Sequence, residues 1–174
     1  MNQQTGRYLP RRTLSLNVGF LLDGQTQSKD IEIDLPAVRM TDTLVFEYVC
    51  GSLRVSRTRE GLLVQGEMSV GMQGDCYRCL EHVERPIEFR VEELYATNAE
   101  IDRDEAEFRV REDGKLDLAP LLRAEVLIQT TRGLRCEDTV ACDRRMDVLE
   151  QEAGIDHIDP RMAKLKELLE QQNQ

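Results

Sequence analysis

Residues 62–91 read LLVQGEMSVGMQGDCYRCLEHVERPIEFRV. Apolar side chains recur at alternate positions in residues 62–70 and again in residues 87–91. A period of two is typical of a β-strand with one buried face. Between the two segments lies a CxxC pair, Cys76 and Cys79. The stretch therefore predicts two antiparallel strands joined by a turn that carries both thiols.

A CxxC pair can serve as two metal ligands, as a disulfide or as a redox switch. The chain has five cysteines and a hydrophobic share of 40%, so it can form an ordinary core. An odd number of cysteines argues against a disulfide scaffold and indicates a reducing cytoplasm. A thioredoxin-like site is disfavoured, because its CxxC begins a helix after a parallel strand. Cys50 ends an apolar segment and is expected to be a small core residue.

Further strands are predicted before the CxxC turn. Turn-forming residues at 59–61 predict a hairpin between residues 52–58 and 62–70. Alternating apolar residues at 14–22 and at 31–35 predict two more half-buried strands. The first part of the chain is therefore expected to be mostly β-structure.

The hydrophobic period becomes helical near Asp117. This residue can cap a helix, Pro120 is tolerated in the first turn, and residues 130–133 end the helix. Asp159, followed by proline, starts a second helix over residues 159–172. The fold class predicted from these patterns is α+β: mainly antiparallel β-sheet or a partly closed β-barrel, followed by two C-terminal helices.

A chain of this length is expected to form a single domain, residues 1–174, with its core at about residues 10–170. Residues 98–107 are acidic and weakly patterned, so an exposed acidic loop is predicted there. Residues 134–158 have no clean period and carry two cysteines, which predicts a cysteine-bearing loop.

Charge is distributed unevenly along the chain. The net charge is −10; residues 1–30 carry four basic and two acidic groups, whereas residues 81–120 carry six basic and thirteen acidic groups. An acidic surface repels a nucleic-acid backbone and can attract basic proteins. Aromatic residues make up only 5% of the chain, which disfavours a stacking surface for single strands. No apolar run suggests a membrane span, and residues 1–5 lack the core of a secretion signal.

Three motifs occur in a fixed order: CYRCL at 76–80, LDL at 116–118 opening a helix, and DPRMAKL at 159–165. Over roughly residues 10–170 this combination resembles the large ribosomal RNA subunit accumulation protein family, the YceD-like proteins. Members of that family share a CxRCL turn, an IDL helix start and a DPR tail. The resemblance implies a bacterial or organellar protein needed for accumulation of large-subunit (23S) ribosomal RNA, and it implies no known catalytic activity.

A structural zinc site is one hypothesis for the cysteines. Zinc takes four ligands in a tetrahedron; Cys76 and Cys79 supply two, and Cys136 and Cys142 supply the others if the tail folds back. His82 is a substitute ligand. The gap between Cys136 and Cys142 is long for a tight knuckle, and many relatives carry a denser cysteine knuckle there. Reduced thiols without a metal and a CxxC redox switch remain alternatives.

Basic residues offer a candidate contact for RNA or a partner. Arg54 and Arg57 lie on the predicted hairpin, and Arg78 lies inside the CxxC turn. If the three gather on one face they form a small phosphate-binding patch. Ordinary surface charge is the alternative.

The leading functional prediction is a non-enzymatic, cytoplasmic factor in ribosome biogenesis. Its expected partners are a ribosome assembly intermediate, large-subunit ribosomal RNA, or a basic ribosomal or biogenesis protein, with no membrane and no small-molecule substrate. A metal-stabilised or thiol-dependent interaction module unrelated to ribosomes is the alternative. A nuclease would need clustered carboxylates for Mg²⁺, and the acids of residues 98–107 are scattered.

Overall fold

The computed structural model describes residues 8–24, 26–97 and 107–153. Helices and strands follow one another in this order: β1 (Leu9–Pro10), the 3₁₀ helix η1 (Arg11–Leu14), β2 (Ser15–Asn17), α1 (Gly19–Leu22), β3 (Ser28–Leu35), β4 (Val38–Arg39), β5 (Val45–Phe46), β6 (Tyr48–Arg57), β7 (Gly61–Asp75), β8 (His82–Ala96), β9 (Phe108–Arg109), β10 (Lys115–Asp117), α2 (Ala119–Gln129) and α3 (Thr139–Glu152).

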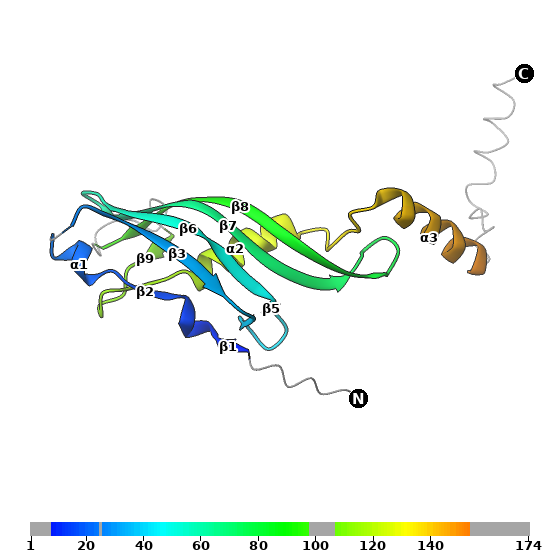
Figure 1. Ribbon diagram of the computed structural model, residues 1–174, viewed down its shortest axis with the longest axis horizontal. Coiled ribbons are helices and arrows are strands. Elements are labelled where there is room, and N and C mark those ends of the chain that lie inside the picture. Colours follow the sequence, from blue (N-terminus) through cyan, green and yellow to red (C-terminus); the bar gives the residue numbers. More distant parts are fainter. Residues whose placement is uncertain (1–7, 25, 98–106, 154–174) are drawn as a thin grey trace, which may run out of the picture.

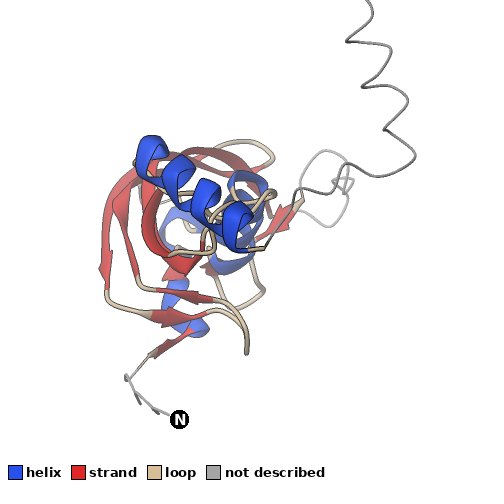
Figure 2. Cartoon of the chain, turned by 90° about the vertical axis from the view of Figure 1, so that its right-hand side faces the viewer, coloured by secondary structure: helices blue, strands red, loops and turns tan. Residues whose placement is uncertain are grey.

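The main sheet has five strands in the order β3-β6-β7-β8-β9, so β3 and β9 are its edges and it does not close into a barrel. The strands β3, β6, β7 and β8 are antiparallel neighbours, whereas β9 pairs with β8 in parallel. The long strands run along the molecule with α2 behind them and α3 beyond one end (Figure 1). Seen from the α3 end, the strands curve around one side of the molecule (Figure 2).

Alternation of apolar and polar residues gives this sheet two distinct faces. One face buries Val55, Val64 and Val91 in a core that also contains Leu122 of α2 and Leu21 of α1. The opposite face carries mostly polar side chains that are exposed or half-buried, as the period of two requires. The hairpin predicted around residues 59–61, the strands flanking the CxxC turn and the α+β class are therefore confirmed.

Residues 14–22 do not form the predicted strand. They contain the end of η1, the three-residue strand β2 and the single-turn helix α1. The fully buried members are Leu14, Val18 and Leu21; Val18 and Leu21 are three residues apart, at the N-cap and within the turn of α1. Leu21 is not part of the alternating set: residues 20–22 are all apolar, and this break in the period of two left a turn of helix possible.

The predicted loop over residues 134–158 is also wrong, because residues 139–152 form α3. Asp138 caps this helix: its carboxylate accepts a hydrogen bond from the Ala141 N–H at 2.9 Å. The capping residue Asp138 indicated a helix start in the sequence, but the apolar residues after it do not recur with a clear helical spacing. The predicted helix over residues 159–172 and most of the predicted acidic loop, residues 98–106, lie outside the described residues.

The helix predicted after Asp117 is α2, and Pro120 lies in its first turn as expected. The carboxylate of Asp117 accepts a hydrogen bond from the Ala119 N–H at 3.0 Å, which satisfies a free N–H group at the start of the helix. No helix among the described residues is long and apolar enough to cross a membrane.

Candidate metal centre

The CxxC turn is a tight reversal between β7 and β8. The Cys76 N–H donates to the carbonyl of Glu81 at 2.8 Å, and the Leu80 N–H donates to the carbonyl of Cys76 at 2.9 Å. Leu80 has φ of 60°, in the left-handed region that favours glycine. The reversal directs both Cys76 and Cys79 to the same buried side of the turn.

The other two cysteines come from the segment after α2. Residue 134 forms an isolated parallel bridge with Cys76, and the Tyr77 N–H donates to the carbonyl of Leu134 at 2.9 Å. This pairing lays the segment against the CxxC turn and places Cys136 beside it. Cys142 follows in the first turn of α3, immediately after the Asp138 cap. The long gap between Cys136 and Cys142 is therefore bridged by the start of a helix.

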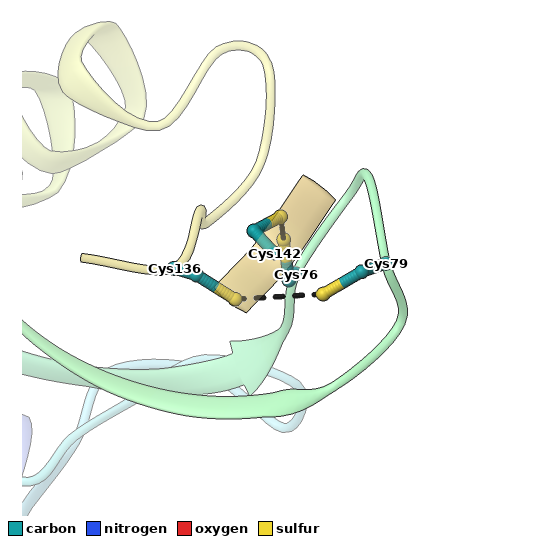
Figure 3. Close-up of side chains that lie close together, drawn as sticks. All are labelled: Cys76, Cys79, Cys136 and Cys142. Carbon is teal, nitrogen blue, oxygen red and sulfur yellow. Dashed lines mark hydrogen bonds between the residues drawn. The ribbon is translucent and has the colours of Figure 1, made fainter. Parts of the chain in front are cut away.

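Four sulfur atoms meet where these segments cross, and Figure 3 shows their side chains converging. All four Sγ atoms lie within 4.8 Å of one another. The Sγ atoms of Cys76 and Cys142 are 3.8 Å apart, and those of Cys79 and Cys136 are 3.5 Å apart. A zinc ion with Zn–S bonds of about 2.3 Å in a tetrahedron separates its sulfurs by about 3.8 Å. The spacing matches a tetrathiolate site and far exceeds the roughly 2.05 Å of a disulfide bond.

The cluster is isolated from water and from the main core. All four cysteines are buried, and Val83 and Met146 pack around them as a second, smaller apolar cluster. Burial raises the cost of an isolated negative charge, so thiolates here need compensating donors or a cation. The surroundings supply some of these donors.

Backbone N–H groups of the turn point at the thiols. Burial alone would raise the pKa of Cys76, but hydrogen bonds from the N–H groups of Cys79, Arg78 and Cys136 outweigh it and lower the pKa from 9.0 to about 6. The Glu81 N–H lowers the pKa of Cys79 against the effect of burial. Burial, together with the neighbouring thiols, raises the pKa of Cys142. The CxxC turn is thus constructed to hold thiolate, the form that binds metal.

Charged side chains surround the cluster. Arg145 of α3 donates from Nη2 to the Cys136 Sγ at 3.5 Å, and its Nε lies 3.8 Å from a carboxylate oxygen of Glu81. A guanidinium beside the sulfurs offsets part of the negative charge that four thiolates would bring. Arg78 and Asp143 form an ion pair at 2.6 Å that joins the turn to α3.

His82 does not join the sulfur cluster. It lies on the exposed side of β8, where its Nδ1 is 3.3 Å from a carboxylate oxygen of Asp75. The four cysteines alone therefore make up the candidate ligand set among the described residues.

The three arginines proposed as a contact patch do not gather. Arg54 and Arg57 lie near the β6–β7 hairpin, whereas Arg78 lies at the other end of β7. That strand has 15 residues, and at about 3.3 Å per residue its ends lie roughly 45 Å apart along the chain. Each arginine has a local partner: Asp30 for Arg54, the Leu21 carbonyl for Arg57, and Asp143 for Arg78.

Four cysteines in this arrangement fit zinc by the chemistry of the donor set. Sulfur is the ligand that zinc prefers in structural sites, and four thiolates fill its tetrahedron. Reduced thiols without a metal would leave four polar sulfurs buried side by side with only backbone donors and Arg145 as partners. The long spacing between Cys136 and Cys142 no longer argues against a metal, because the bridge at residue 134 and the start of α3 bring both sulfurs to the CxxC turn.

Comparisons with known proteins place these features in a family. The family model described as "Large ribosomal RNA subunit accumulation protein YceD" matches residues 64–169. The "Uncharacterized protein YlbN" of Bacillus subtilis (strain 168) is 27% identical over 117 residues, which cover 64% of this chain and 66% of that protein. No solved structure gives a significant match. Because the family model covers more than half of the chain, including all four clustered cysteines, the protein belongs to the YceD family.

Proposed function

We propose that this protein is a non-enzymatic factor of ribosome biogenesis that promotes the processing or accumulation of large-subunit ribosomal RNA. It acts by binding an assembly intermediate or another biogenesis protein. Membership of a family named for large ribosomal RNA subunit accumulation is the observation that carries this proposal. The CYRCL turn and the sequence at the start of α2 resemble motifs of the same family, which agrees with this proposal.

Within this function the cysteine cluster serves as a structural zinc site. Zinc held by four protein ligands keeps no open position for a substrate or a water molecule, unlike catalytic zinc, which has three protein ligands. The two cysteines after α2 are joined to the CxxC turn mainly through this cluster and the backbone bridge at residue 134. Zinc would supply a crosslink between these segments; the four thiolates would hold it, and Arg145 would offset part of their negative charge.

The reducing cytoplasm suits such a site, since thiols there stay available for metal rather than forming disulfides. A protein that catalyses no reaction acts through the partners that its surface binds. We therefore place its activity in what its folded surface binds, and we propose neither a small-molecule substrate nor a membrane partner.

The test of this function is the ratio of large- to small-subunit ribosomal RNA in cells that have lost the protein. Loss is expected to lower the large-subunit species selectively. Re-expression of the wild-type chain should restore the ratio, and so should the variant Asp147→Asn, whose exposed side chain on α3 lies outside the cluster.

An unchanged ratio across several growth conditions would contradict the proposal. In that case, capture of non-ribosomal partners by the purified protein would favour an interaction module unrelated to ribosomes, the second interpretation of the same metal-stabilised fold. Restoration by Asp147→Asn but not by Cys142→Ser would link the function to the cysteine cluster.

A further inference from the structure

The face of the main sheet that points away from the core is open to solvent over β3, β6, β7 and β8. Residues paired across antiparallel strands share a face, so the strand register decides which side chains meet there. Two adjoining rows lie at its centre: Glu32, Ser52, Glu67 and Arg90 in one, and Asp34, Cys50, Ser69 and Glu88 in the other.

Two lines of carboxylates border this face. We define the β3 rail as Asp30, Glu32 and Asp34, and the β8 rail as Glu84, Glu88 and Glu92; all six are exposed. Basic residues of the same strands and face are Arg54 and Arg90. Arg54 is already 3.6 Å from a carboxylate oxygen of Asp30. The net charge of this face is therefore strongly negative.

Between the rails the sheet is hollowed. Small side chains, those of Cys50, Ser52 and Ser69, lie on the middle strands beside Glu67, and Gly51 has no side chain. They line a depression of about 660 Å³, here called the trough, whose lining also includes three acids, Glu32, Glu67 and Glu88, and one base, Arg90. Cys50 is thus a half-buried residue of an outward-facing surface rather than the core residue expected from the sequence.

The dimensions of the trough suit an extended polypeptide. The rails are three strand spacings apart, about 14 Å at 4.7–4.9 Å for each spacing. A chain lying along the strands between them could direct alternate side chains to opposite rails. Lysine and arginine have long apolar stems, which can cross the small side chains of the trough while their charges reach the carboxylates.

We propose that the trough binds an extended, lysine- and arginine-rich segment of a protein. This inference rests on the proposed function and deepens it, since basic proteins accompany ribosomal RNA in assembly intermediates. RNA itself fits this surface poorly, because the rails repel phosphates. Ordinary surface charge explains this face less well than a peptide site does, because the carboxylates lie on both sides of a hollow.

The test measures binding of the full chain to a labelled peptide in which lysine alternates with arginine, so that both sides of the extended chain carry positive charge. A length of about ten residues, at roughly 3.3 Å each, is enough to run along both rails. The rail variant combines Glu84→Gln, Glu88→Gln and Glu92→Gln. Its matched control, Asp147→Asn with Glu150→Gln and Glu152→Gln, removes the same charge from exposed positions of α3. We expect the rail variant to raise Kd about tenfold and the control to raise it less than about threefold.

A second pair of variants tests the trough without changing charge. Ser52→Phe fills the hollow, whereas Ser56→Phe adds the same ring four residues along the same strand and face, outside the trough. Only Ser52→Phe is expected to weaken the peptide complex. A uridine oligonucleotide of similar length should bind more weakly than the peptide.

Equal weakening by the rail and α3 variants, or wild-type affinity of Ser52→Phe, would overturn the proposal. Tighter binding of the oligonucleotide would overturn it in favour of RNA. Failure here is distinguishable from failure of the proposed function: the ribosomal RNA ratio could still fall on loss of the protein, yet be fully restored by the rail variant. An unchanged ratio would reject the ribosomal role and leave the binding result to stand on its own.

Discussion

At the residue scale, the cysteines are not equivalent. Cys142 lies in the buried cluster, 3.8 Å from the Cys76 sulfur, whereas Cys50 is half-buried on the outer face of the sheet. Both are free thiols on described elements, so a serine at either position changes one atom only. Comparing the serine variants at Cys142 and Cys50 therefore distinguishes the loss of a metal ligand from the loss of a thiol elsewhere.

We predict that Cys142→Ser loses bound zinc while Cys50→Ser keeps about one zinc per chain. The reason is that a serine hydroxyl does not replace a thiolate as a zinc ligand. Elemental analysis of protein purified without chelator measures the metal. Cobalt reconstitution of the wild-type chain should show thiolate-to-cobalt charge-transfer absorption, a signal that does not depend on how the variant folds. The zinc site would be contradicted if the wild-type protein contained no metal and its melting temperature did not change when a chelator was added.

At the element scale, α3 depends on the cluster for its position. Cys142 is its fully buried residue, and Met146 and Arg145 are partly covered beside it. The ion pair of Arg78 with Asp143 adds little, because both side chains are about half exposed. α2, by contrast, buries four apolar residues in the main core.

We predict that chelation of the metal increases hydrogen exchange of the α3 amides by about tenfold or more, because the helix loses its attachment. The amides of α2 should change far less, which makes α2 the internal control. Hydrogen exchange with and without chelator, read by mass spectrometry, gives both values in one experiment. Unchanged protection of α3 after verified metal removal would show that packing alone holds the helix.

At the scale of the whole molecule, Tyr95 connects the sheet to the elements packed on it. Its ring stacks on Phe108 with centroids 5.3 Å apart, and its hydroxyl donates to the carbonyl of Asp117 at 3.1 Å. The side chain is 1% exposed. Burial, helped by the charges of Asp117 and Glu93, raises the pKa of Tyr95 well above its ordinary 10.0.

This shift makes global stability fall at high pH. A pKa that is higher in the folded state gives stability that is fully present below the unfolded value and is lost as pH rises past it. At neutral pH, Tyr95→Phe should cost about 1 kcal/mol through loss of the hydrogen bond. The difference from wild type should shrink as pH rises above 10.0. Denaturant unfolding at neutral and alkaline pH measures it.

Tyr48→Phe is the matched control, since Tyr48 is 36% exposed on the outer face of β6. Its difference in free energy of unfolding from wild type should stay small and constant over the same range. A constant difference for Tyr95→Phe as well would show that ionisation of the buried hydroxyl does not contribute to alkaline unfolding.

The sequence by itself determined the β6–β7–β8 meander, the CxxC turn and the start of α2. Each depends on local chemistry: a period of two over long strands, turn residues between them, and proline in a first helical turn after Asp117. Local patterns of that length are compatible with few other secondary structures. The family could also be identified at this level, because its motifs are short and occur in a fixed order along the chain.

Only the tertiary structure decided which segments meet. The cluster needs Cys76 and Cys142, 66 positions apart, to approach within 3.8 Å, and no local period encodes that distance. The same holds for the rails, whose acids come from β3 and β8 and become neighbours of one trough only through the strand register. Residues 14–22 show the opposite case: their local pattern predicted a strand, but residues 20–22 are all apolar, and burial of Val18 and Leu21 selected a turn of helix. Pairing between distant segments is set by how the whole chain buries its apolar surface, which no single stretch contains.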